Sequence, residues 1–175
     1  MMAWALAGTI LIGVSALSMP TVIRQVMGML IFIVAFTWFD CVGWGLAIHR
    51  HQRWHDRTLT APYRIIQHLF MASLALNVLI FHGWPAMAGG LAAYWFGCCD
   101  VLFYLFLRLP MPRLNESGGP FHYDWMEGWS VHGLLKAVAR AAGGKRYACH
   151  RRGFVGFAIL GFILGLAICL GRSPG

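Results

Sequence analysis

Long apolar runs with almost no charged residues dominate this sequence of 175 residues, of which 59% are apolar and only 11% charged. Because the hydrocarbon core of a bilayer is about 30 Å thick, runs of this length are typical of membrane-spanning helices. A helix satisfies its own backbone hydrogen bonds, as any segment inside a bilayer must. We therefore predict an all-α fold, a polytopic bundle of about five transmembrane helices in one membrane domain. The predicted spans lie near residues 3–19, 26–48, 64–82, 86–107 and 153–171.

Basic residues are concentrated in two of the segments between these spans. Twelve of the fourteen lysines and arginines lie in residues 49–64 and 108–152. Segments rich in lysine and arginine stay on the cytoplasmic side of a membrane. We therefore predict a multi-pass protein of the inner (cytoplasmic) membrane, with the N-terminus inside and the C-terminus outside. A turn near residues 20–25 and a hairpin at residues 82–85 then lie outside.

The formal net charge of +8 would also fit a nucleic-acid-binding protein. The basic residues, however, stand beside apolar spans, where they orient a membrane protein. We therefore predict the lipid bilayer as the partner of these residues and no nucleic acid.

The first apolar run is the shortest, and it has two interpretations. Residues 16–18 read Ala-Leu-Ser and resemble the small-residue cleavage site of a signal sequence. No positive charge precedes the run, however, as it would in a signal sequence. We expect the segment to be retained as a span, and its removal would leave the arrangement of the other four unchanged.

The segment 108–152 has a helical pattern of its own after a stretch rich in proline and glycine. Apolar residues recur on one face of this pattern and basic residues on the other, which is typical of a helix lying in the membrane interface. We predict one cytoplasmic amphipathic helix here. Its apolar residues are Val131, Leu134, Leu135 and Val138, and its polar residues are His132, Lys136 and Arg140.

Two acidic residues lie within predicted spans, which is the least ordinary feature of the sequence. Asp40 precedes His49 by nine residues and Asp100 precedes Arg108 by eight, so both lie roughly 12–14 Å from the same membrane boundary. A charged aspartate at this depth costs on the order of 2.5–3.5 kcal/mol, so such residues pair, face the bundle interior or mark a functional site. The two carboxyl groups could share a proton, ligate a cation, or hydrogen-bond separately to neighbours such as Asn77.

Histidines approach the same boundary from several segments. Neutral imidazole is the commonest protein ligand of transition metals, and histidines at several helix ends can converge on one ion. We therefore predict a metal centre that holds a transition metal, iron or zinc. Its candidate ligands are His49, His51, His55, His68, His122, His132, Asp40 and Asp100.

Two other interpretations of the histidines remain open. Three histidines of residues 49–55 alternate with Arg50 and Arg53, a composition that also fits a segment contacting lipid headgroups. His49 and His68 would suit the two axial positions of a b-type haem.

The histidine layout resembles that of the membrane fatty-acid desaturase and hydroxylase superfamily. The stretch from His49 to Thr58 is similar to the first histidine box of that family, and further histidines follow the fourth predicted span. The resemblance would imply two bound irons. The chain contains no H-x-x-H-H sequence, so the similarity is confined to the layout.

The sequence contains no hydrolase, nucleotide-binding or zinc-protease signature that would name a reaction. We expect an integral membrane protein with a histidine and aspartate centre, oxidoreductase-like if it is an enzyme. The alternative is a small accessory or assembly subunit that meets a membrane partner, or a second copy of itself, through Gly161 and Gly165 of the last span. A transporter is less favoured, because no inverted repeat or pair of broken helices is visible.

Overall fold

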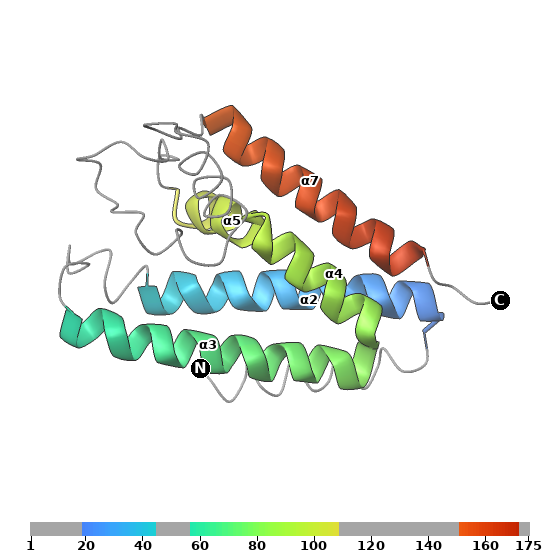
Figure 1. The fold of residues 1–175 in the computed structure, drawn as a ribbon, viewed down its shortest axis with the longest axis horizontal. Helices are drawn as coiled ribbons and strands as arrows, with labels where there is room; N and C mark the ends of the chain where they lie inside the picture. Colours follow the sequence, from blue (N-terminus) through green and yellow to red (C-terminus); the bar gives the residue numbers. More distant parts are fainter. Residues whose placement is uncertain (1–18, 45–56, 109–150, 172–175) are drawn as a thin grey trace, which may run out of the picture.

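The computed structural model describes residues 19–44, 57–108 and 151–171 of the chain. These residues form helices and no strand, which confirms the predicted all-α fold (Figure 1). The helices are α2 (Thr21–Asp40), α3 (Arg57–His82), α4 (Trp84–Trp95), α5 (Cys98–Phe106) and α7 (Arg151–Leu170).

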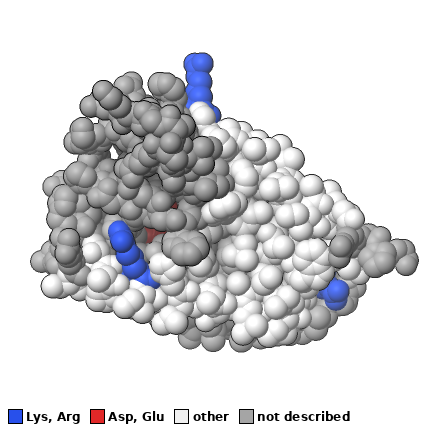
Figure 2. Space-filling model, in the orientation of Figure 1, with Lys and Arg blue, Asp and Glu red and all other residues white. Residues whose placement is uncertain are grey.

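Three of these helices are long and apolar enough to cross a membrane: α2 with its extension to Trp44, α3 and α7. The bent pair α4 and α5 makes a fourth span if it is counted as one. Large apolar side chains such as Ile65, Leu69 and Ile163 are exposed on the outside of the bundle, as lipid contact requires. Charged side chains are sparse on the face shown in Figure 2. The predicted first span, residues 3–19, and the interfacial helix within residues 108–152 lie outside the described residues.

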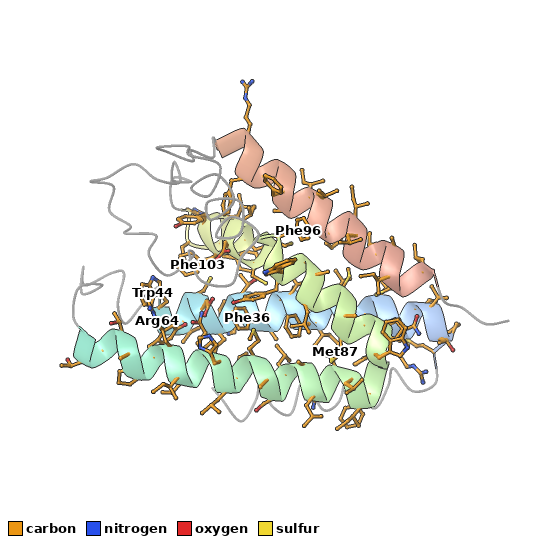
Figure 3. The ribbon with its side chains drawn as sticks, in the orientation of Figure 1. Phe36, Trp44, Arg64, Met87, Phe96 and Phe103 are labelled. Carbon is orange, nitrogen blue, oxygen red and sulfur yellow. The ribbon has the colours of Figure 1, made fainter. Side chains whose placement is uncertain are left out.

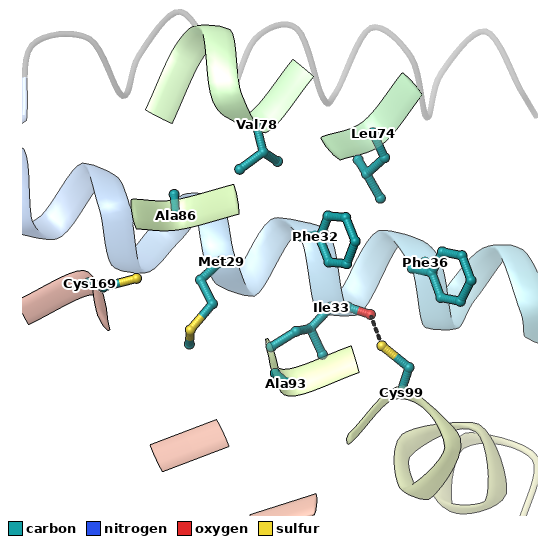
Figure 4. Close-up of a cluster of buried hydrophobic side chains, with 10 residues drawn as sticks. All are labelled: Met29, Phe32, Ile33, Phe36, Leu74, Val78, Ala86, Ala93, Cys99 and Cys169. Carbon is teal, nitrogen blue, oxygen red and sulfur yellow. Dashed lines mark hydrogen bonds between the residues drawn. The ribbon is translucent and has the colours of Figure 1, made fainter. Parts of the chain in front are cut away.

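Helices α2 and α3 lie side by side, α4 returns across α2, and α7 packs on α4 (Figure 1). The core between them is built from one face of α2 (Figure 4), where Met29, Phe32, Ile33 and Phe36 are almost fully buried. Because lipid is as apolar as these side chains, such a bundle is held together mainly by van der Waals packing between closely fitting helices. The remaining buried members of this cluster are Leu74, Val78, Ala86, Ala93, Cys99 and Cys169.

The tight turn between α3 and α4 is the predicted hairpin. Gly83 has a φ of +87°, a conformation that glycine adopts without strain, and Pro85 lies in the first turn of α4. We call the end of the bundle that contains this turn the hairpin end. The opposite end, where α2 finishes and α3 begins, is the pocket end.

The glycines of α7 are used for packing inside the chain. A Cβ atom on Gly165 would lie 2.7 Å from the carbonyl oxygen of Gly89, so the backbones of α7 and α4 approach closely there. Gly161 similarly faces the side chain of Phe96. The small-residue face of the last span therefore contacts α4 of the same chain.

The predicted span near residues 86–107 is not one straight helix, because the structure divides it into α4 and α5. The two helices meet at an angle of 68°. Gly97, between them, has a φ of +86° in the left-handed region that favours glycine. Because glycines are common in apolar helices, Gly97 could not be recognised from the sequence as the point where the helix breaks.

Helices α2 and α3 both begin earlier than the predicted spans. Helix α2 starts at Thr21, so the predicted turn over residues 20–25 is helical from its second residue onwards. Helix α3 starts at Arg57, within the predicted loop 49–64. Hydropathy marks where a chain is apolar, whereas a helix continues past the hydrocarbon region into the polar boundary. At its other end α2 widens into a π-helical turn over residues 41–44.

Candidate functional site

A small cavity lies at the pocket end, between α2, α3 and α5. We call it the acidic pocket, because Asp40 and Asp100 both line it. Figure 3 shows three of its lining residues, Trp44, Arg64 and Phe103, at this end of the bundle. The cavity has a volume of about 20 Å³, room for a single water-sized occupant. The lining residues are Asp40, Trp44, Arg64, Gln67, Asp100 and Phe103.

Asp40 is fixed in place by two donors from α3. It is 8% exposed, and its Oδ1 accepts hydrogen bonds from Tyr63 Oη at 2.7 Å and Gln67 Nε2 at 2.9 Å. Tyr63 and Gln67 are four residues apart, so they project from the same side of α3. Both bonds end on one oxygen, and Oδ2 of Asp40 has no hydrogen bond within the described residues.

Tyr63 is itself held by the end of α2. Its ring stacks on Phe39 with centroids 5.9 Å apart and meets the ring of Trp44 at 5.5 Å. Gly43, in the π-helical turn, faces the Tyr63 ring, and a Cβ atom there would collide with it. Single π-helical turns often occur at functional sites, where they re-aim side chains. Here the turn places Trp44 on the wall of the acidic pocket.

Asp100 reaches the pocket because the chain bends at Gly97. It lies in the first turn of α5, where a negative charge interacts favourably with the helix dipole. Its Oδ2 lies 3.6 Å from the position that a Cβ atom on Gly97 would occupy. In the described part of the chain no hydrogen bond to its carboxyl group is seen. Asp100 therefore contributes its carboxyl group to the same cavity as Asp40.

Arg64 is the basic residue among those that line the cavity. It follows Tyr63 in the sequence, and its side chain is exposed at the edge of α3. Among the described residues no ion pair within 4 Å joins Arg64 to Asp40 or Asp100. In Figure 2, acidic atoms are visible close to a basic side chain on this face of the molecule. Charges of both signs thus surround a space instead of contacting one another.

The structure brings together two of the predicted metal ligands, Asp40 and Asp100. His68 lies elsewhere: its ring is exposed, its Nδ1 donates to the Arg64 carbonyl oxygen at 2.6 Å, and it does not line the cavity. Within the described ranges, no three histidine, cysteine or acidic residues gather as they would around a metal ion. The other predicted ligands, His49, His51, His55, His122 and His132, lie outside the described residues.

Sequence reasoning missed Tyr63 and Gln67, the two donors to Asp40. It named Asn77 as a partner, but Asn77 lies more than two turns farther along α3 and does not line the cavity. The sequence did contain a signal for these two donors. They share one side of α3, at helical spacing, with two apolar residues that are buried in the structure, Leu74 and Val78.

At the hairpin end, polar side chains bond to the backbone. His82 is 1% exposed, and its Nδ1 donates to the Arg24 carbonyl oxygen at 3.0 Å. The Cys169 thiol lies 3.7 Å from the carbonyl oxygen of Gln25 and 3.6 Å from that of Pro85, as a weak donor. Nε of Arg24 and Oε1 of Gln25 are buried there and have no hydrogen-bond partner among the described residues.

The acidic pocket therefore offers mainly oxygen ligands, from two carboxylates and an amide, around a space for one small occupant. Such ligands suit hard cations, and added imidazoles would suit iron or zinc. The chain matches no protein-family model, no curated protein and no solved structure. Functional interpretation therefore rests on the geometry of the pocket.

Proposed function

We propose that the protein is an integral membrane protein that binds one small cation between the carboxylates of Asp40 and Asp100. The observation that supports this proposal is the cavity shared by these two residues, which come from different helices. Two ionised carboxylates inside a membrane are costly, and a cation between them would offset that cost. The small volume of the cavity favours a single ion over an organic ligand.

The proposed ion is a metal ion, and iron or zinc is the choice that the histidines favour. Asp40 and Asp100 would supply carboxylate oxygens, and Gln67 would orient Asp40 through its hydrogen bond. Imidazoles from His49, His51, His55, His122 or His132 would complete the coordination of a transition metal. Without them, the oxygen ligands alone would suit Mg²⁺, Mn²⁺ or Ca²⁺.

The proposed orientation places the pocket end in the cytoplasm. Helices α3 and α7 begin at the pocket end (Figure 1), and their N-terminal turns contain Arg57, Arg64, Arg151 and Arg152, whereas the first turn of α2, at the hairpin end, contains Arg24. The excess of arginine follows the positive-inside rule for an inner membrane. The proposed ion would then enter from the cytoplasm, with the N-terminus inside and the C-terminus outside.

Equilibrium dialysis against Zn²⁺, Mn²⁺ and anaerobic Fe²⁺, one metal at a time, tests the proposal. We expect about one ion per chain for the wild-type protein and at least a tenfold weaker affinity for Asp100→Asn, which keeps the shape of the side chain. His68→Gln is the matched control, because His68 does not line the cavity, and its affinity should be unchanged. Equal binding by wild-type protein and Asp100→Asn, or no binding of any of these ions, would refute the proposal.

A further inference from the structure

The wall of the acidic pocket is partly aromatic. Trp44 and Phe103 line the cavity together with the two aspartates (Figure 3). Phe103 follows Asp100 by three residues on α5, so the two side chains project from the same side of that helix. Neither an indole nor a phenyl ring has a lone pair to offer to a metal ion. The aromatic wall therefore shapes the cavity without adding to the coordination of an ion.

Both rings are held in place by their neighbours. The ring of Trp44 lies 5.5 Å from that of Tyr63, whose hydroxyl group donates to Asp40, so the indole stands close to this carboxylate. Phe103 is 7% exposed and belongs to a buried apolar cluster that includes Phe154 of α7. Side chains packed in this way resist turning aside, because close-packed interiors yield little. The width of the cavity is therefore set by the fold.

The width of the cavity limits how much water an ion can bring with it. Its volume of about 20 Å³ holds about one water molecule. Asp40 offers mainly Oδ2 to an ion, since its Oδ1 already accepts two hydrogen bonds from α3. An octahedral ion such as Mg²⁺ would need several waters besides the carboxylates, and it gives up its waters reluctantly. Zn²⁺ is satisfied by a tetrahedral set of ligands, in which a single water is common.

We propose that Trp44 and Phe103 determine the specificity of the acidic pocket by excluding the hydration water of the ion, so that the pocket accepts Zn²⁺ and rejects Mg²⁺ and Ca²⁺. This inference rests on the proposed cation site. Carboxylate oxygens alone would accept all three ions, so the discrimination comes from space and not from the type of ligand. Ca²⁺ takes even more ligands than Mg²⁺ and is excluded for the same reason.

The test measures the affinities of Mg²⁺ and Zn²⁺ separately, in the wild-type protein and in Trp44→Ala and Phe103→Leu. Binding at the pocket is the part that Asp100→Asn removes. Trp44→Ala opens room for more waters, so the affinity for Mg²⁺ relative to Zn²⁺ should rise by about tenfold, and Phe103→Leu should produce a smaller rise. The ratio is informative because general loosening of the protein would weaken the binding of both ions.

Two matched variants control for the loss of an aromatic ring elsewhere on the same helices. Trp38→Ala removes a tryptophan of α2 that is 54% exposed, and Phe106→Leu changes a phenylalanine of α5 that is 48% exposed. Neither residue lines the cavity, so both variants should keep the wild-type ratio. Relaxation of water protons by bound Mn²⁺ gives a second readout: the wild type should leave about one water on the ion, and Trp44→Ala more.

The outcomes separate this inference from the proposal beneath it. If the wild type binds Mg²⁺ at the pocket about as tightly as Zn²⁺, or if Trp44→Ala and Phe103→Leu keep the wild-type ratio, the specificity role is wrong and the cation site stands. An equal change of the ratio in Trp38→Ala would also overturn the role, since the effect would not arise at the wall of the pocket. If the wild type binds none of Zn²⁺, Mn²⁺ and Fe²⁺, the site and the role are both refuted.

Discussion

The two ends of the bundle treat polar side chains in different ways. At the hairpin end, His82 and Cys169 bond to backbone carbonyl oxygens, and α4 and α7 meet closely through glycines. At the pocket end, Asp40 is held by side chains of α3, Asp100 has no hydrogen bond within the described residues, and a cavity lies between them. His82 and Cys169 are thus bonded to the backbone, whereas the two aspartates at the pocket end face a common cavity.

Glycines show the same contrast. At the hairpin end, Gly28, Gly89 and Gly165 bring helices close together, since a Cβ atom on each would meet a neighbouring helix. At the pocket end, Gly97 bends the chain and Gly43 makes room for the ring of Tyr63. We therefore expect the first set to act mainly on stability and the second set to act also on the positions of the pocket residues.

The largest effect is expected where backbones touch. Gly165→Ala places a Cβ atom 2.7 Å from the Gly89 carbonyl oxygen and 2.8 Å from Met29 Sδ, so the helices must separate. Overpacking of this kind costs about 2–3 kcal/mol, which should appear as a lower Tm in detergent. Gly156→Ala, on the same helix with nothing within 4 Å, should change Tm little. Similar losses for both variants would show that close approach is not the cause.

Two single substitutions, one at each end of the bundle, should change different properties of the protein. His82→Ala removes a buried hydrogen bond and should lower the free energy of unfolding by about 2 kcal/mol without changing cation affinity. Asp100→Asn should do the reverse, with metal-free stability unchanged or raised by up to about 1 kcal/mol and affinity reduced at least tenfold. Chemical unfolding without metal and Zn²⁺ titration measure the two quantities. A large loss of stability in Asp100→Asn would assign that carboxyl group a structural role.

Gly97→Ala should lower both the stability of the protein and its affinity for the cation. An alanine in the left-handed conformation costs about 1–2 kcal/mol, and its Cβ atom would lie 3.3 Å from Phe154 Cε2. Relief of this strain would alter the bend that carries Asp100, so cation affinity should fall together with Tm. Gly156→Ala again serves as the control. Normal affinity in a destabilised Gly97→Ala protein would mean that the bend does not position the carboxylate.

The smallest effect is expected for Tyr63→Phe. This change removes one of the two donors to Asp40 and keeps the aromatic packing on Phe39. We expect a loss of about 0.5–1.5 kcal/mol in the free energy of unfolding and a weakening of Zn²⁺ affinity by a few fold. Gln67 still holds the carboxyl group, so complete loss of binding would contradict this account.

Much of the fold could be predicted from the sequence because a bilayer imposes one strong rule. Apolar length alone identifies α2, α3 and α7 as spans, and counting residues at a fixed rise places Asp40 and Asp100 at matching depth. The bend at Gly97 could not be predicted, since one glycine in an apolar run has the same composition whether the helix continues or breaks. In the structure, the bend is accompanied by the contacts of Phe96 with Gly161 and of Gly97 with Phe154, which the composition does not reveal.

The site was predicted in part. Depth along the membrane follows from position in the chain, whereas direction around a helix axis depends on which neighbours pack against it. Asp40 and Asp100 share a cavity as their depth suggested, but His68 at a nearby depth points to the outside of α3. The identity of Tyr63 and Gln67 as donors depends on the side of α3 that meets α2, which hydropathy does not resolve. The contributions of the other histidines stay predictions.

The most direct test of the central claim is a double-mutant cycle of Zn²⁺ affinity with Asp40→Asn, Asp100→Asn and the double variant. If the two carboxylates hold one ion, each single substitution should remove most of the binding and the double variant should bind little more weakly than either. Losses of affinity that simply add, or single variants that bind as the wild type does, would show that the two aspartates do not share a cation.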